Sequence, residues 1–262
     1  MSGSSALLTR PLRSLALALA ALTASLPGHA LLIDRFSTAH PPIHDVSGGS
    51  VATSSATGVD IVGGERDVLV GSETWSDVTG ATRFSAAAGA ATASADQNGL
   101  GQVRLDYDGI GWPFDENSPL SLDLTDAGSS DRFILDVTAI TGRVQIIINV
   151  GVSGGQLPPF LQAGWLEIDS IGSFEVPFSD FRLVGTAPGP SFESAAQVTL
   201  FVRVESAEAM SIDAFCTGRS GATCKPAAPL SGPSSLSLLL PALGLTMLVP
   251  RRRKSRHVGS TG

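Results

Sequence analysis

Short segments in which apolar and polar residues alternate constrain the fold of this chain more than any other feature. In residues 133–137 the odd positions are apolar and an aspartate falls on the other face. In residues 197–205 the apolar even positions alternate with Thr199, Phe201 and Arg203. A period of two with one polar face is typical of strands in antiparallel sheets. The pattern therefore predicts an all-β domain.

Ten segments bounded by Gly, Pro, Asp or Ser are predicted as strands. They are Val59–Val62, Asp67–Val70, Gln102–Tyr107, Leu120–Leu124, Arg132–Ala139, Arg143–Val150, Gly164–Asp169, Ser173–Pro177, Gln197–Glu205 and Met210–Phe215. The Ala-rich residues 85–95 are interrupted by Gly, Ser and Thr, and we interpret them as small-residue strands or as loop. No long segment with a helical period lies inside the domain, so two packed sheets are expected.

The charges of the chain are unevenly distributed. All 24 acids lie between Asp34 and Asp213, whereas seven of the 17 bases lie in the two ends. The middle of the chain therefore contains 10 bases and 24 acids, which gives it a net charge of −14. An acidic domain is a poor ligand for phosphate backbones, so we expect no nucleic-acid partner.

Residues 1–30 have the three parts of a secretory signal peptide. Arg10 and Arg13 precede an apolar stretch of signal length, and Gly28 and Ala30 are small residues before a cleavage site after Ala30. The apolar stretch is shorter than the ~20 residues that span a bilayer. We therefore expect export with removal of this segment, with a retained N-terminal anchor as the alternative.

The C-terminal segment is also organised for a membrane. Residues 226–235 are a Pro/Ala/Ser linker, residues 236–254 an apolar stretch that ends in bases, and residues 255–262 a polar tail. Bases after an apolar stretch hold their end in the cytoplasm. The residues that carry the pattern are Pro233, Ser234, Ser235, Leu236, Arg251, Arg252 and Arg253.

This layout resembles the PEP-CTERM sorting signal of exported bacterial proteins. The resemblance implies processing by an exosortase-type membrane protease and an association with exopolysaccharide production. It also implies a location in the cell envelope or outside the cell. A plain C-terminal membrane anchor is the alternative.

Two further resemblances lie inside residues 31–225, which we expect to form one domain. Residues 32–36 (LIDRF) and 63–67 (GGERD) resemble the opening of many PEP-CTERM exported proteins. Residues 174–181 (FEVPFSDF) and 211–213 (SID) resemble the closing strands of carbohydrate-binding-module jelly rolls. Together they imply a jelly-roll-like antiparallel β-sandwich.

Cys216 and Cys224 are the only cysteines of the chain. In an exported protein an even number of cysteines favours a disulfide. Closing a loop of this size contributes about 2–3 kcal/mol in the chain-entropy model. No histidine or third cysteine lies nearby in the sequence to complete a tetrahedral metal site.

A structural calcium ion is the metal that the sequence favours most. Asp106 and Asp108 place two carboxylates close together before a turn glycine, and hard cations prefer oxygen ligands. The resemblance to jelly-roll binding modules implies a calcium site near the first and last strands instead. Asp34 and Asp213 are the alternative ligands on that basis.

Exposed aromatic rings are the usual means of binding a sugar face, and this chain has few aromatic residues. Tyr107 and Trp112 are the candidate glycan-binding residues, because Trp112 lies in a loop rich in Gly, Pro and Asp. Trp165 begins an alternating segment and is expected in the core.

The sequence therefore favours a non-enzymatic surface or matrix protein that associates with extracellular polysaccharide. A binding module with a defined glycan site near Tyr107 and Trp112 is the first alternative. The second is an acid-dependent glycoside hydrolase, which needs two carboxylates on either side of a glycosidic bond. Asp106 and Asp108, with the nearby Asp115 and Glu116, are the acids available for that role.

Overall fold

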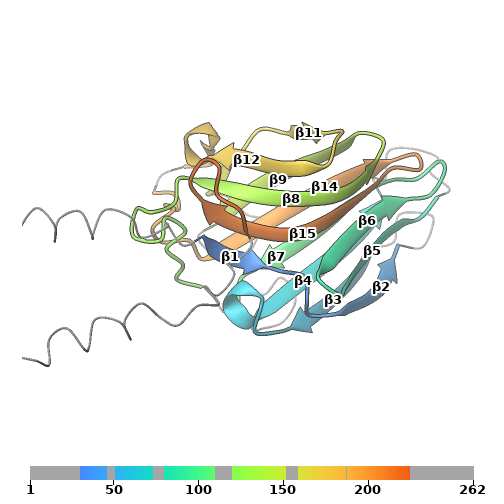
Figure 1. The fold of residues 1–262 in the computed structure, drawn as a ribbon, viewed down its shortest axis with the longest axis horizontal. Helices are drawn as coiled ribbons and strands as arrows, with labels where there is room; N and C mark the ends of the chain where they lie inside the picture. Colours follow the sequence, from blue (N-terminus) through green and yellow to red (C-terminus); the bar gives the residue numbers. More distant parts are fainter. Residues whose placement is uncertain are drawn as a thin grey trace, which may run out of the picture. The chain divides into compact units, whose positions relative to one another are not determined.

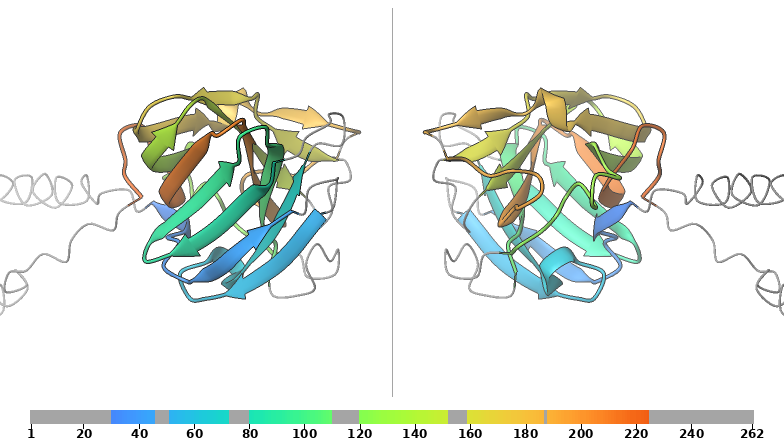
Figure 2. Two further views of the ribbon diagram at one scale, coloured as in Figure 1. Left: turned by 90° about the vertical axis from the view of Figure 1, so that its right-hand side faces the viewer. Right: turned by 90° about the vertical axis from the view of Figure 1, so that its left-hand side faces the viewer.

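The computed structural model describes residues 30–45, 51–72, 80–109, 120–151, 159–186 and 188–224. The chain divides into two compact units, Met1–Lys225 and Pro226–Gly262, and all described residues belong to the first. They form two facing β-sheets with the core between them (Figures 1 and 2). In this part of the chain no helix has the length and apolar character needed to cross a membrane.

The first sheet has seven strands, in the order β12-β8-β15-β6-β5-β2, with β1 also paired to β15. Its strands are β1 (Leu31–Asp34), β2 (His40–His44), β5 (Thr82–Ala87), β6 (Ala90–Ala95), β8 (Arg132–Thr141), β12 (Gly172–Pro177) and β15 (Ala209–Gly218). Each ladder in it is antiparallel.

The second sheet has eight strands, in the order β13-β10-β9-β14-β7-β4-β3, with β11 also paired to β9. Its strands are β3 (Val51–Thr57), β4 (Glu65–Ser72), β7 (Leu100–Tyr107), β9 (Val144–Gly151), β10 (Phe160–Gln162), β11 (Leu166–Ile168), β13 (Arg182–Val184) and β14 (Gln197–Glu205). Its ladders are antiparallel too. The predicted jelly-roll-like antiparallel β-sandwich is confirmed.

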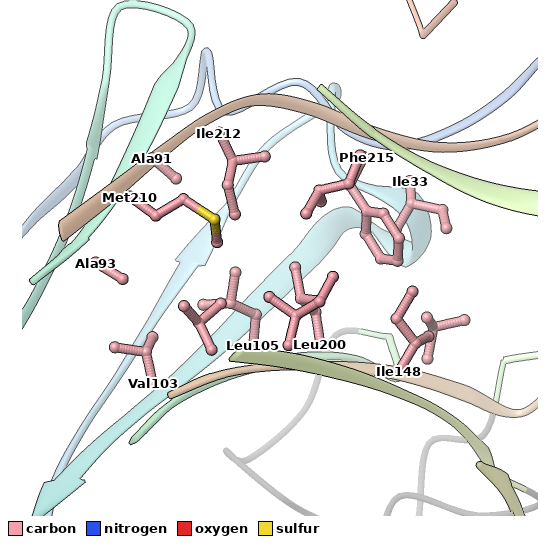
Figure 3. Close-up of a cluster of buried hydrophobic side chains, with 14 of the residues drawn as sticks. Ile33, Ala91, Ala93, Val103, Leu105, Ile148, Leu200, Met210, Ile212 and Phe215 are labelled. Atoms are coloured by element: carbon pink, nitrogen blue, oxygen red, sulfur yellow. The ribbon is translucent and has the colours of Figure 1, made fainter. Parts of the chain in front are cut away.

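The core consists of the inward-facing residues of both sheets. In Figure 3, Met210, Ile212 and Phe215 of β15 point toward Leu105 of β7 and Leu200 of β14. These side chains are at most 2 % exposed. Ile212 and Phe215 both point inward, although they are three residues apart, because the register of β15 shifts between Ile212 and Ala214. The described core residues lie between Ile33 and Cys224, within the predicted domain of residues 31–225.

The Ala-rich segment forms strands rather than loop. Residues 82–87 and 90–95 make the β5–β6 hairpin, and Ala91, Ala93 and Ala95 of β6 point into the core. The alternation is hard to detect from hydrophobicity, because the inward alanines of β6 alternate with outward residues that are also small. Strand β3 was not predicted, because it too consists mainly of small residues on both faces.

Two predicted strands are wrong. Residues 59–62 contribute only a single bridge, between Ile61 and Asp34, before the 3-10 turn η1 (Val62–Gly64). The chain turns there because Gly63 and Gly64 have φ angles of 75° and 87°, which glycine adopts without strain. Residues 120–124 also contribute only one bridge, between Leu122 and Ala195.

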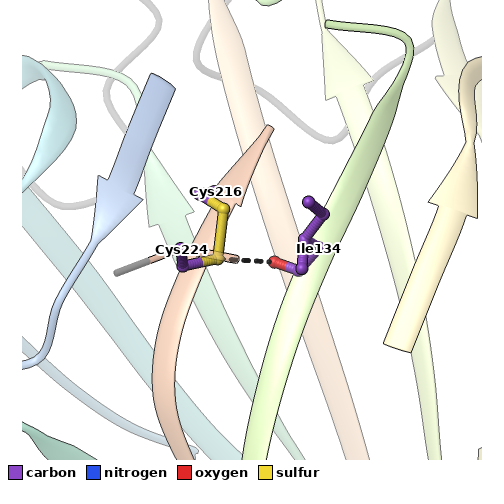
Figure 4. The surroundings of a disulfide bond; sticks show 3 residues. All are labelled: Ile134, Cys216 and Cys224. Atoms are coloured by element: carbon purple, nitrogen blue, oxygen red, sulfur yellow. Dashed lines mark hydrogen bonds between the residues drawn. A yellow bond between two sulfur atoms is a disulfide. The ribbon is translucent and has the colours of Figure 1, made fainter. Parts of the chain in front are cut away.

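The predicted disulfide is confirmed. Cys216 in β15 is bonded to Cys224, whose Sγ also lies 3.5 Å from the carbonyl oxygen of Ile134 in β8 (Figure 4). Both sulfurs are buried in a small cluster on the outer face of the first sheet, which also contains Ala30 and Leu32. The start and the end of the described domain therefore pack against each other.

A buried ion pair joins the LIDRF and GGERD segments. The Arg66 guanidinium lies 2.6 Å from the Asp34 carboxylate, and both side chains are fully buried. Arg66 also donates to the carbonyl oxygen of Thr38, and its guanidinium lies 5.4 Å from the centre of the Phe36 ring. The other partners of Asp34 are the backbone N–H of Phe36 and the hydroxyl of Tyr107, which both donate to it.

We expect Arg66→Met to lower the free energy of unfolding by about 3–5 kcal/mol, because Asp34 would keep a buried charge without its cation. Burial already raises the pKa of Asp34, against the effect of Arg66. The loss should therefore shrink as the pH falls and the carboxyl becomes protonated. Urea unfolding at several pH values measures both effects.

The matched control is Arg83→Met, which breaks the solvent-exposed pair with Asp96. It should cost less than about 1 kcal/mol. An Arg66→Met variant that loses no more stability than this control would contradict the role of the buried pair.

Candidate functional site

A row of polar side chains crosses the outer face of the eight-stranded sheet. Period two directs alternate residues of each strand outward, and the ladder registers align them between strands. From β13 to β3 the row contains Arg182, Gln162, Asn149, Thr199, Asp106, Asp67 and Ser55. We call it the polar row. Because neighbouring strands are about 4.8 Å apart, the row places a polar group at regular steps across the sheet.

A hollow of about 260 Å³ lies over one half of this face, where β10, β9, β14 and β7 are neighbours. Three aromatic rings, three amide side chains and one isoleucine line it: Phe160, Trp165, Phe201, Gln102, Asn149, Gln162 and Ile147. Trp165 keeps 49 % of its surface exposed, whereas Phe201 is almost covered. We call this the aromatic–amide hollow.

The chemistry of the hollow suits a neutral molecule with both an apolar face and hydroxyl groups. Aromatic faces pack against C–H groups, and each amide offers two donors and an acceptor. The described residues that line the hollow include no charged side chain. A charged ligand would therefore gain no ion pair from this lining.

Arg104 connects the hollow to the other half of the polar row. Its guanidinium lies 2.5 Å from the Asp106 carboxylate and 5.9 Å from the centre of the Phe201 ring. The hydroxyl of Thr199 donates to the same carboxylate at 2.5 Å. Charge-assisted hydrogen bonds of this kind hold their groups in fixed positions. Arg104 thus supports the ring of Phe201 from the side of β7.

The acidic half of the polar row is buried. Asp67 faces Asp106 across the β4–β7 ladder, and both are at most 1 % exposed. Asp108 follows on the same face and is 5 % exposed. Burial, together with the charges of Asp67 and Asp106, raises the pKa of Asp108 to about 7. Asp108 is therefore partly protonated at neutral pH.

The residues predicted from the sequence lie in different places. Tyr107 is fully buried in the core, where its hydroxyl donates to Asp34, so its ring has no face open to a sugar. Burial and the nearby Asp34 charge hold the pKa of Tyr107 well above its usual value. Trp112, with Asp115 and Glu116, lies outside the described residues. The seven sorting-tail residues, from Pro233 to Arg253, also lie outside them.

The sequence offers two alternative pairs of calcium ligands, Asp106 with Asp108 and Asp34 with Asp213, and three of these four carboxylates have side-chain partners in the fold. Asp34 is held by Arg66, Asp106 by Arg104, and Asp213 accepts a hydrogen bond from Thr138. A cation at Asp34 would have to displace the guanidinium from its carboxylate. In the described ranges, no group of three or more His, Cys, Asp or Glu is arranged to hold a metal ion.

Sequence reasoning missed the aromatic residues of the hollow. Trp165 was expected in the core, but it precedes β11 and is half exposed. Phe201 occupies an outward position of β14, among Thr199 and Arg203. The position of Phe201 among the polar residues of an alternating strand is the sequence signal that could have placed its ring on the outer face of the sheet. Phe160 carried no such signal, because its strand has only three residues.

A second hollow, of about 390 Å³, lies beside β1 and the 59–62 segment. Aliphatic residues and two aspartates, Asp60 and Asp126, line it. The carboxylate of Asp60 is already occupied by the hydroxyl groups of Ser37 and Thr38. The described lining contains neither an aromatic ring nor an amide, so the aromatic–amide hollow is the stronger candidate for a functional site.

Comparison with known proteins shows similarity in architecture only. No protein-family model and no curated protein matches the chain. Solved structures that match include the family 11 carbohydrate-binding module of the cellulosomal cellulase Lic26A-Cel5E of Clostridium thermocellum. It shares 13 % identity over 74 % of this chain and 97 % of that one, with a TM-score of 0.36.

Two other structures match at similar values. A family 11 module from Clostridium thermocellum in complex with a β-1,3-1,4-mixed-linked tetrasaccharide has 12 % identity and a TM-score of 0.35, covering 74 % of this chain and 98 % of that one. The solution structure of CtCBM11 has 12 % identity and a TM-score of 0.38, covering 75 % and 98 %.

We expect Asp108 to make the stability of the domain depend on pH. Its carboxyl titrates near 3.8 in the unfolded chain and near 7 in the fold. Its contribution to stability is therefore complete below about pH 4 and is lost as the pH rises through 7. Asp108→Asn should be about 1–3 kcal/mol more stable than the wild type at pH 8, and close to it at pH 4.

Urea unfolding at pH 4, 6 and 8 tests this expectation. Asp169→Asn, which removes an exposed carboxylate, is the control and should leave the pH profile unchanged. A wild-type profile that Asp108→Asn does not flatten would show that Asp108 is not the group responsible.

Proposed function

We propose that residues 31–225 form a non-catalytic domain that binds a neutral polysaccharide in the aromatic–amide hollow. The observation that carries this proposal is the combination of three aromatic rings and three neutral amides in one hollow on a sheet face. Pyranose rings have apolar C–H faces and a rim of hydroxyl groups, so they match both kinds of side chain.

The charges of the domain support a neutral ligand. The middle of the chain carries a net −14, so long-range repulsion opposes the approach of an anionic polymer. The lining of the hollow offers no cation to compensate for that repulsion. It also offers no carboxylate among its described residues, so it gives no support to an acid-dependent hydrolase.

We also propose that the chain is exported and becomes a surface or matrix protein associated with extracellular polysaccharide. The signal-like N-terminus and the PEP-CTERM-like tail are the sequence support for this proposal. The Cys216–Cys224 disulfide is consistent with it, because disulfides persist in oxidising compartments outside the cytoplasm. Processing by an exosortase-type enzyme is the finer part of the same proposal.

We expect Trp165→Ala to weaken glycan binding at least tenfold, because it removes the most exposed ring of the hollow. Purified residues 31–225 would be titrated calorimetrically with mixed-linked β-1,3-1,4-glucan, cello-oligosaccharides and, as the anionic comparison, alginate. Ile171→Ala is the control, since Ile171 is 66 % exposed but lies outside the hollow. It should bind like the wild type.

The glycan proposal fails if no neutral polymer in this set binds, or if alginate binds best. It also fails if Trp165→Ala retains the wild-type affinity while its melting temperature is unchanged. A loss that Ile171→Ala shares equally would indicate a nonspecific effect of surface truncation.

The intact mass of the protein recovered from its native host tests export and sorting. We expect a mass that lacks residues 1–30, and a second cut near residues 233–236 if the tail is processed. Deleting residues 251–254 should then abolish the second cut and change the location of the protein. A full-length mass, or processing that this deletion leaves unchanged, would contradict the respective part of the proposal.

A further inference from the structure

Strand β3 is an edge strand that lacks the features by which edge strands usually avoid pairing with strands of other molecules. Sheet borders are protected by proline, charge or short length, because an open backbone edge recruits further strands. Of the four strands at the ends of the two sheets, β2 contains Pro41-Pro42, β12 contains Glu175 and ends at Pro177, and β13 has only three residues with Arg182. Strand β3 has seven residues, no charge and no proline.

The backbone of β3 is regular enough to serve as a template. All seven residues pair with β4 in one register without a bulge. The outward side chains of Val51, Thr53, Ser55 and Thr57 are exposed. In Figure 1 the strand lies at the lower border of the molecule, below β4. Among the described strands, β4 is its one ladder partner.

The nearest strand of the other sheet cannot extend this ladder. Strand β2 approaches β3, and the His40 ring lies beside the backbone of Ser54. The two prolines that follow in β2 have no N–H to donate. Within the described ranges, no strand therefore continues the ladder of the second sheet beyond β3.

We propose that β3 pairs with β3 of a second copy of this chain, antiparallel about a twofold axis at Ser54, so that the two eight-stranded sheets become continuous. In this arrangement Thr53 of one copy faces Ser55 of the other, and Ala52 faces Ala56. Facing hydroxyl side chains stabilise antiparallel pairs, and each facing pair consists of small residues without charge. A twofold axis satisfies both edges with one contact.

If two copies associate, their charges make the β3 edge a more favourable contact than the rest of the surface. Two copies that each carry −14 repel each other, so a stable contact requires a part of the surface without acids. The uncharged seven-residue edge provides such a contact. Salt screens the remaining repulsion over about 10 Å at 0.1 M. The dimer should therefore become stronger, not weaker, as ionic strength rises.

Pairing of this kind would have a consequence for a polymer-binding protein, although it does not depend on the proposed ligand. The hollows of two copies would lie on one extended sheet surface. A long chain bound by both would dissociate more slowly than from one, through effective concentration alone. A single edge contact is small, so we expect a reversible dimer.

Sedimentation equilibrium of residues 31–225 over 10–500 µM, at 0.05 and 0.5 M NaCl, tests the proposal. We expect reversible doubling of the mass, stronger at 0.5 M. Thr53→Lys should lower the association constant at least tenfold, because it places two ammonium groups at the joined edge. Thr138→Lys, the same change at an exposed position of the interior strand β8, is the control and should dimerise like the wild type.

Amide hydrogen exchange of the wild type gives a second readout that needs no variant. The β3 amides should exchange more slowly at 500 µM than at 10 µM, while those of β12 and β13 should not change. The proposal is overturned if the protein stays monomeric throughout, or if Thr53→Lys dimerises like the wild type. Concentration-dependent protection at another border would overturn it too. None of these outcomes bears on glycan binding, which the Trp165→Ala comparison tests separately.

Discussion

The ion pair between Arg66 and Asp34 is the contact on which the rest of the sandwich depends. It lies between the sheets, where β1 of one sheet meets β4 of the other, and it is fully buried. Desolvating two charges is expensive, and only further hydrogen bonds make it tolerable. The Phe36 N–H, the Thr38 carbonyl and the Tyr107 hydroxyl supply them. The two short motifs are therefore two halves of one contact.

The strand order of the two sheets separates the two faces of the domain. Cys216, Cys224 and the start of β1 occupy the outer face of the seven-stranded sheet. The aromatic–amide hollow lies on the outer face of the eight-stranded sheet. A molecule bound in this hollow would therefore lie on the opposite side of the sandwich from the disulfide and the start of β1. The registers of β9, β14 and β7 align the hollow's side chains, so the fold itself assembles the site.

The sequence was sufficient for the class of fold but not for the site. Alternation in residues such as Val198 and Leu200 has one physical cause, a strand with one buried face, so it predicts strands directly. Where both faces carry small residues, as in β3 and β6, the amplitude of the pattern disappears. The hollow depends on which strands become neighbours, and Phe160 and Gln102 meet only through two intervening strands. Tyr107 is the opposite case. The sequence suggested an exposed ring for it, but its ring is buried and its hydroxyl donates to Asp34.

The disulfide also determines how a mechanical load would enter the domain. A pull applied to the chain at residue 225 reaches Cys224 first and then crosses the sulfur–sulfur bond to Cys216 in β15. The seven residues between the cysteines are bypassed and carry no tension. The force is delivered to a strand that is hydrogen-bonded to β8 and β6, and to β1 at its end. A domain tethered by its C-terminal end would therefore resist extension through the interior of a sheet rather than through a fraying terminus.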